Sequence, residues 1–540
     1  MSGTTMWTRR APRYSRRRFL QQASVAGAAI GLGPLLKACG LGATDKPIAG
    51  RMLGPDTASG HLLRGGKLPT PSQWTTQDAI VVGGGIAGLA TARRLRSLGR
   101  SHCVLELEAE AGGNARAGYN AHTAYAWGAH YLPLPNPETT EVRELLEEMG
   151  LITGYTGGLP VYDERALVHA PEERLFYRGV WQRGLIPSRG LPARAQAEFE
   201  RFFAETARHR DAVDAQGRPH FALPLDRSAP GSPRELDSLS LADYLLREGY
   251  QSTELHGYLD YCTRDDYGLG LGNTSAWAGL HYFAARRGLA ANAEPNSELT
   301  WPMGNAYLAR YLAQQARAQL RLRRLVHRIQ RSPQGWEVWA YDLDRKQSEG
   351  YHCQQLYYAS PLHTLPYVYA DPPELPELLH TPWLVAQLHL RPEINPLPGY
   401  GQPLSWDNVN YGGQGLGYVV ANHQQLRGHP GPLTLTYYRP LTHMPPAEAR
   451  RWAQRRSHAQ WVQEVLADLA GPHPALRSQL HSLDCWLWGH GMVGPRPGYL
   501  WGTERARLQE DQGGGLHLVH TDVSGISLFE EAYCRGLSVS

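Results

Sequence analysis

The predicted folded region of the chain begins with a buried-strand pattern, which is followed by a helical pattern. Residues 79–82, Ala-Ile-Val-Val, form a continuous apolar run, which is typical of a strand buried on both faces. Apolar residues then recur at helical spacing from residue 89 to residue 98, and a second apolar run follows at residues 103–105. This order of strand, helix and strand predicts an α/β fold.

Helical and strand patterns also alternate farther along the chain. Apolar spacing predicts an amphipathic helix over residues 193–213 and one long helix over residues 447–469. Apolar runs predict three strands, at residues 383–390, 416–421 and 434–438. A chain of 540 residues is too long for a single ordinary core, so we expect at least two domains.

Composition and charge narrow the class of protein. The chain is 42% hydrophobic and 19% charged, which is typical of a globular protein. Residues 1–38 hold seven of the 54 basic residues and no acidic one, so the remainder carries 47 basic against 50 acidic residues. The body therefore offers no nucleic-acid-binding face. The six cysteines show neither metal-ligand spacing nor a disulfide framework, and we predict no metal site.

The basic N-terminal region has the character of an export signal. Residues 15–20, Ser-Arg-Arg-Arg-Phe-Leu, resemble the twin-arginine motif and precede a short apolar stretch. Residues 1–39 are therefore interpreted as the signal region, the twin-arginine translocase as a partner, and the periplasm as the destination. Cys39 ends a lipobox-like segment, so it is a candidate lipid anchor and the only expected membrane contact. Residues 40–76, rich in Gly, Pro and Thr, are interpreted as a linker.

A glycine-rich turn between the first strand and helix predicts a dinucleotide site. Residues 83–88 spell G-x-G-x-x-G in its proper setting, directly after a strand and at the start of a helix. Gly83 permits the tight turn, Gly85 lets the backbone approach a pyrophosphate, and Gly88 lets the helix pack on the strand. Glu106 follows at the end of the next strand, where a carboxylate accepts ribose hydroxyls.

After Glu106 the chain continues with Ala-Glu-Ala-Gly-Gly-Asn-Ala-Arg at residues 109–116. This stretch resembles the flavin-containing amine oxidase and phytoene desaturase superfamily. That resemblance covers most of residues 78–540 and implies FAD as the cofactor. Asn114 stands where the family usually has an arginine, and Arg116 follows two positions later. The cofactor contacts implied within the first block of the chain are Gly83, Gly85, Ile86, Ala87, Gly88, Glu106, Gly112, Gly113, Asn114 and Arg116.

Two later segments extend the same resemblance. Val326 matches the residue whose backbone meets adenine in the family. Asp522 is implied to meet the ribityl–phosphate part of FAD, and a helix starting near Ile526, with Ser527, to face the flavin. The resemblance implies a discontinuous Rossmann-like FAD-binding domain and an α+β substrate domain. Their expected boundaries are residues 77–135, 300–365 and 485–540 for the first, and 136–299 and 366–484 for the second.

Candidate catalytic residues are weaker predictions than the cofactor contacts. His130 follows the Gly-Ala segment that passes the flavin in the family, so it could bind substrate or accept a proton. Tyr411 and His490 lie in aromatic-rich stretches that could line a substrate cavity. Asp265 and Asp266 are adjacent and so do not form a carboxylate pair; one of them is expected to pair with Arg264.

The leading interpretation is an exported FAD-dependent oxidoreductase that passes a hydride from an organic small-molecule substrate to the flavin, and then electrons to oxygen or a carrier. We expect the protein to fold around FAD in the cytoplasm. The twin-arginine route fits this expectation because it exports folded proteins. No lysine stands where many amine oxidases of the family have one near the flavin. Two alternatives stay open: a desaturase or isomerase of an apolar substrate, and a non-catalytic FAD-binding envelope protein.

Overall fold

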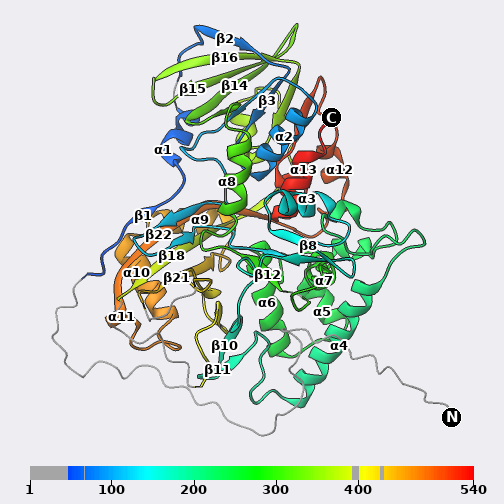
Figure 1. The fold of residues 1–540 in the computed structure, drawn as a ribbon, viewed down its shortest axis with the longest axis vertical. Helices are drawn as coiled ribbons and strands as arrows, with labels where there is room; N and C mark the ends of the chain where they lie inside the picture. Colours follow the sequence, from blue (N-terminus) through cyan, green and yellow to red (C-terminus); the bar gives the residue numbers. More distant parts are fainter. Residues whose placement is uncertain (1–46, 66, 296, 392–400, 426–430) are drawn as a thin grey trace.

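The computed structural model describes residues 47–65, 67–295, 297–391, 401–425 and 431–540 (Figure 1). A five-stranded parallel sheet forms the centre of one body, with strand order β13-β4-β3-β17-β23. Its strands are β3 (Ala79–Val82), β4 (His102–Leu105), β13 (Leu320–Arg321), β17 (Gln355–Tyr358) and β23 (Leu516–Leu518). The α/β class predicted from the strand–helix–strand order is confirmed.

Both faces of this sheet are buried, which explains why its central strand β3 is apolar at every position. Ala79 and Val81 of β3 pack toward the helical side, whereas Ile80 and Val82 pack toward a second sheet, as the period of two requires. The helices on the first side are α2 (Ile86–Ser97), α8 (Ala306–Gln315) and α13 (Phe529–Leu537). The second sheet has the order β14-β15-β16-β2, with β14 (Arg324–Ser332), β15 (Gly335–Asp342), β16 (Gln347–Cys353) and β2 (Gln73–Thr76).

The other body contains an eight-stranded mixed sheet, with order β1-β22-β18-β21-β20-β19-β10-β11. Its strands are β1 (Met52–Leu53), β10 (Glu173–Tyr177), β11 (Val180–Arg183), β18 (Leu379–Leu390), β19 (Asp407–Asn410), β20 (Gly417–Val420), β21 (Thr434–Pro440) and β22 (Leu480–Gly494). Helices α9 (Pro446–Gln454) and α10 (His458–Asp468) cover one face, while the other carries a cluster of tryptophan and tyrosine side chains.

Helices and short hairpins complete the molecule. A helical region beside the large sheet consists of α4 (Ala193–Asp211), α5 (Leu241–Arg247), α6 (Thr253–Tyr267) and α7 (Ala276–Ala284) (Figure 1). The remaining helices are α1 (Thr57–Gly60), α3 (Thr140–Glu148), α11 (Leu476–Gln479) and α12 (Thr503–Gln509). Three small strand pairs are β5 (Ala117–Tyr119) with β6 (Ala124–Ala126), β7 (Tyr131–Pro133) with β12 (Glu298–Thr300), and β8 (Ile152–Thr156) with β9 (Leu159–Tyr162). None of the helices in the described ranges is long and apolar enough to cross a membrane.

Three local expectations differ from the structure. The helix predicted over residues 447–469 is two helices, because Ser457 starts a new one with a capping box to Gln460. The helix expected near Ile526 begins at Phe529, since Gly525 has a φ of +80° and the chain is still turning there. β22 pairs along its length with β18, so the segment from residue 485 to 494 belongs to the large sheet rather than to the cofactor body.

The predicted linker also differs in its described part. Residues 47–76, apart from residue 66, contribute β1 to the large sheet and β2 to the four-stranded sheet. This stretch is therefore built into both bodies by backbone pairing and is not a free tether. The signal region, Cys39 and the start of the linker lie outside the described residues.

Candidate functional site

The glycine-rich turn forms the cradle that its sequence predicts. β3 ends at Val82, Gly83 takes a φ of +104°, and α2 begins at Ile86 with Gly85 as its N-cap. No described side chain caps this helix, so its first backbone amides point outward and favour an anion such as a phosphate. A Cβ on Gly88 would lie 1.9 Å from the Gly83 carbonyl oxygen, so only glycine fits at position 88.

A second glycine pair packs against the first. The Gly112 amide donates to the Gly84 carbonyl at 2.8 Å, and a Cβ on Gly113 would lie 3.3 Å from the Gly85 Cα. Gly112 and Gly113 both have positive φ angles, which favour glycine. The two glycine segments leave a backbone-lined surface at the N-terminus of α2, which fits a pyrophosphate.

Glu106 completes the edge of this cradle. Its carboxylate accepts hydrogen bonds from the amides of Gly84 at 2.6 Å and Glu108 at 2.8 Å. Burial raises the pKa of this carboxyl, and the two amide donors act in the opposite direction. Glu106 is thus fixed beside the glycine turn at the end of β4, as a ribose-binding acid would be. The donor set and the side-chain-free surface together fit FAD.

Other predicted cofactor residues have protein partners in the structure. The Asn114 amide donates to the Gly491 carbonyl of β22, and Arg116 pairs with Glu108 at 3.2 Å. Val326 is buried in β14, opposite Ala340. The Ser527 hydroxyl accepts from the Val493 amide at 3.1 Å. Each lies in or beside the cofactor body, and their cofactor contacts stay predictions.

Asp522 is the most strongly held of the predicted cofactor residues. It is fully buried in the turn after β23, and its carboxylate accepts from the Leu362 amide and from His380 Nε2, both at 2.7 Å. Burial opposes ionisation of Asp522, but His520 and His380 outweigh it and hold the pKa of the carboxyl well below its usual range. Asp522 therefore carries a buried negative charge where the two bodies meet.

His490 belongs to this same region. Its ring stacks on His363 with centroids 4.0 Å apart, and His380 lies 5.9 Å away. Burial and the neighbouring His363 lower the pKa of His490 to about 2, and burial lowers that of His363 to about 4. Both rings are neutral at pH 7. His490 is thus placed beside Asp522, apart from the cavities that His130 lines.

His130 lines both of two adjoining cavities. Its ring stacks on Tyr438 at 4.6 Å, and its carbonyl accepts from the Thr300 hydroxyl at 2.8 Å. Burial lowers the pKa of His130 to about 3, so the ring is a weak base and stays neutral at pH 7. Of the two roles predicted for His130, this environment favours binding substrate over accepting a proton.

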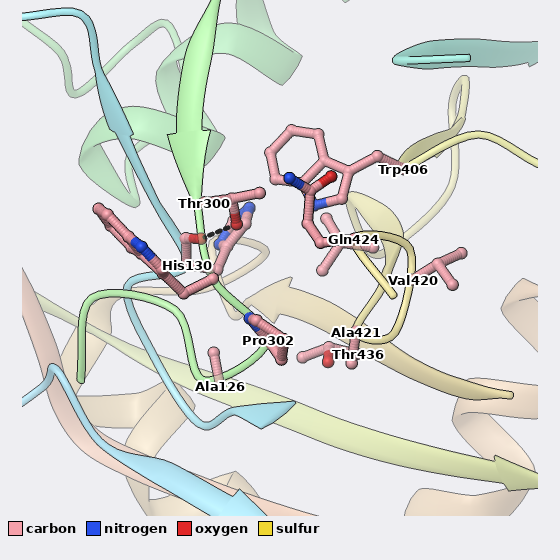
Figure 2. Close-up of a pocket in the computed structure, with 11 residues that line it drawn as sticks. Ala126, His130, Thr300, Pro302, Trp406, Val420, Ala421, Gln424 and Thr436 are labelled. Atoms are coloured by element: carbon pink, nitrogen blue, oxygen red, sulfur yellow. Dashed lines mark hydrogen bonds between the residues drawn. The ribbon is translucent and has the colours of Figure 1, made fainter. Parts of the chain in front are cut away.

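The first cavity has a mixed lining, in which apolar side chains stand beside His130, Thr300, Gln424 and Thr436 (Figure 2). In Figure 2, Trp406 and Gln424 approach from one side, while Thr300, Pro302 and His130 approach from the other. Sequence reasoning missed one residue behind this wall. Gln387 of β18 is fully buried, donates to the Ala126 carbonyl at 2.7 Å and accepts from the Thr436 hydroxyl at 2.9 Å. A glutamine within the apolar run of residues 383–388 was the only signal for it.

The second cavity combines aromatic rings with carboxylates. Its aromatic lining is Tyr131, Tyr261, Trp406, Tyr418 and Tyr438, and its acidic lining is Asp265, Glu298 and Asp407. Burial raises the pKa of Tyr438 well above its ordinary value, and Asp265 and Asp407 raise it further. The hydroxyl of Tyr438 therefore stays protonated, and it faces the same cavity as these carboxyl groups.

Two further expectations, on Asp266 and on Tyr411, are compared with this geometry. Asp266 pairs with Arg286 at 2.6 Å rather than with Arg264, which lies 3.8 Å from Asp260 one helical turn back. Asp265 and Asp266 diverge as expected for neighbours on a helix, and only Asp265 lines the cavity. Tyr411 lines neither cavity; its hydroxyl donates to the Glu254 carbonyl at 3.0 Å, and it supports α6.

This cradle, its ribose-side acid and the neighbouring cavities define a flavin-dependent oxidoreductase. The family model of flavin containing amine oxidoreductases matches residues 86–539, and the chain belongs to that family. The predicted superfamily, FAD as cofactor and the oxidoreductase class are confirmed.

Individual relatives are more distant. A Mycobacterium tuberculosis protein named as a flavin-containing monoamine oxidase, AofH, is 28% identical over 279 residues, which are 50% of this chain and 54% of that protein. The chain thus spans about half the length of this curated relative. Two solved structures share the fold: a putrescine oxidase double mutant (16% identity, TM-score 0.60, 86% and 98% of the two chains) and cyclohexylamine oxidase from Brevibacterium oxydans (17%, 0.59, 85% and 97%).

Proposed function

We propose that this protein is an exported FAD-dependent oxidoreductase that oxidises an amine at the carbon next to nitrogen. The single observation that carries the substrate class is the second cavity, where three carboxylates and five aromatic rings surround the same space. Carboxylates attract a cation, and the faces of tyrosine and tryptophan rings stabilise it further. The carboxylates would repel an anionic substrate.

The chain's own residues prepare the substrate in this proposal. Asp265 and Asp407 hold the ammonium end, while the rings of Tyr131, Trp406 and Tyr438 enclose the apolar part and exclude water. His130 is neutral, so it offers hydrogen bonding without adding a positive charge that would repel the substrate. FAD, when bound, supplies the hydride acceptor. The final electron acceptor, oxygen or a carrier, is a further part of the proposal.

Anaerobic reduction is the experiment that tests the substrate class. The purified flavoprotein is mixed without oxygen with a primary amine, with an alcohol of matched shape, and with an unsaturated fatty acid. Bleaching of the flavin absorbance by the amine alone supports the proposal. Bleaching by the alcohol, or conversion of the fatty acid without net bleaching, contradicts it and favours the second candidate.

A matched pair of variants locates the binding site. Asp265→Asn removes a carboxylate from the cavity, and Asp371→Asn removes an exposed one elsewhere. Loss of one charged contact weakens binding about tenfold or more, so KM for the amine rises in the first variant only. Equal KM values in the two variants would rule out Asp265 as an ammonium partner.

The second candidate is a desaturase or isomerase of an apolar substrate, and the first cavity favours it. Ala126, Pro302, Val419, Val420 and Ala421 form the apolar part of that cavity's mixed lining. Export is tested separately. Lysine in place of both Arg16 and Arg17 is expected to keep the flavoprotein in the cytoplasm, whereas the parent chain reaches the periplasm with FAD bound. A colourless periplasmic protein would contradict export of folded cargo.

A further inference from the structure

A strap formed by residues 47–65 and 67–76 joins the two bodies along one side of the molecule (Figure 1). At its start, β1 pairs with Cys485 and Trp486 of β22, and Arg51 is bonded to Asp484 through both backbone and side chain. At its end, β2 pairs with β16. In Figure 1 the short helix α1 lies between these two attachments.

The centre of the strap is attached beside the ribose-side edge of the cradle. The Asp56 amide donates to Glu108 Oε1 at 2.7 Å, and the Asp56 carboxylate pairs with Arg323 at 2.8 Å. Glu108 is the residue whose own amide donates to Glu106. Arg323 is bonded through its amide to the Glu108 carbonyl, directly before β14 and Val326. One short cluster thus connects the strap to Glu106 and to β14.

We propose that this strap is a fourth segment of the FAD site and that it closes the adenosine end. Glu106 and the start of β14 are the residues expected to meet ribose and adenine, and Asp56 bridges the two segments that carry them. FAD then enters and leaves only when the strap is detached, so the strap sets the rate of both steps. This inference rests on the assignment of FAD as the cofactor.

The distribution of lysines offers a direct test on the holoprotein. Lys67 is exposed in the strap, and the only lysine beyond it is Lys346, in the turn between β15 and β16. A Lys346→Arg variant therefore leaves a lysine-specific protease one cleavage site after residue 47, between α1 and β2. A Lys67→Arg, Lys346→Arg double variant has none and serves as the matched control. The FAD-loaded proteins are treated with protease, passed over a sizing column at high salt, and checked by mass for loss of the fragment ending at Lys67.

FAD release is then followed by fluorescence after dilution, and rebinding after FAD is added back. With the fragment gone, we expect the dissociation rate constant to rise about tenfold or more and rebinding to speed up as well, with no change in the control. An unchanged release rate with the fragment gone overturns the proposal. Loss of all rebinding also overturns it, because the segment is then needed for folding rather than for closure.

A substitution tests the central contact in the uncut chain. Asp56→Asn removes the strap's ion pair with Arg323, and Asp344→Asn removes the other carboxylate on the same arginine, at 3.4 Å, without touching the strap. Faster FAD release in the first variant only is expected, and equal rates in both overturn the role of Asp56. If the cleaved fragment ending at Lys67 stays bound on the sizing column, the protease experiment is repeated with the Asp56→Asn substitution added. A chain that is purified without flavin and takes up none contradicts the cofactor assignment instead.

Discussion

Glu530 provides the sharpest test of the electrostatics around α13. This carboxyl lies in the first turn of the helix expected to face the flavin and is only 3% exposed. Burial raises its pKa from the ordinary value of 4.5 to about 7, Glu531 raises it further, and Arg286 acts in the opposite direction. The folded protein therefore keeps a proton that the unfolded chain gives up between pH 4.5 and pH 7.

The sign and size of the effect on stability follow from that difference. Because the folded state binds more protons in this window, the free energy of unfolding falls as the pH rises from 4.5 to 7. A pKa difference of about 2.5 pH units, at about 1.4 kcal/mol each, corresponds to about 3 kcal/mol. This cost is absent below pH 4.5 and is fully present above pH 7.

Glu530→Gln removes the cost without changing the shape of the side chain. Urea unfolding of the variant and the parent at several pH values should give a difference in stability that grows by about 3 kcal/mol between pH 4.5 and pH 8, in favour of the variant. Any fixed cost of burying the amide is the same at each pH. Glu448→Gln, in the exposed first turn of α9, is the control and should show no such trend. A pH-independent difference for Glu530→Gln would refute the buried-carboxyl argument.

Three other predictions concern the cradle and the two bodies. Gly88→Ala should abolish flavin binding, because the new Cβ would lie 1.9 Å from a backbone oxygen; absorbance of the purified protein reports it, and Gly272→Ala, in open space, should keep its flavin. His130→Gln should change kcat/KM for an amine but leave the apparent pKa values of the rate profile between pH 6 and 9 unmoved, since His130 does not titrate there. A lost ionisation would show that it acts as the base. Asp522→Asn should lower the thermal midpoint by several degrees, because its buried partners Leu362 and His380 lose a charged acceptor; an unchanged midpoint would contradict this.

The cradle could be predicted from sequence because its causes are local. Gly83 is required by the positive φ of the turn, and Gly88 by its close contact with the Gly83 carbonyl. Glu106 lies at the end of the next strand along the chain. The strands at 383–390, 416–421 and 434–438 were also recognisable, since apolar runs of that length bury well in a sheet. Helix boundaries were less predictable, as the capping box at Ser457 shows, because a cap competes with a continuing apolar pattern.

The cavities could not be predicted, because no local pattern brings their walls together. His130, Thr300, Trp406 and Thr436 meet only after four separate segments have packed. The attachment of the strap has the same origin. A stretch rich in Gly, Pro and Thr indicates a linker, but β1 and β2 are short edge strands whose partners lie hundreds of residues away. Edge pairing is fixed by the partner sheet more than by the residues of the edge strand itself.

The two candidate catalytic histidines, His130 and His490, show how much of a residue's role can be predicted from its type and its sequence neighbours. His130 was singled out because it follows the Gly-Ala segment of the resemblance, and His490 because it lies in an aromatic-rich stretch. In the structure His130 lines the two cavities, and His490 stacks on His363 beside the buried carboxylate of Asp522. Both are neutral, because burial by distant segments lowers their pKa values to about 3 and about 2. Since both rings are weak bases near pH 7, neither histidine is expected to act as the base in the proposed reaction.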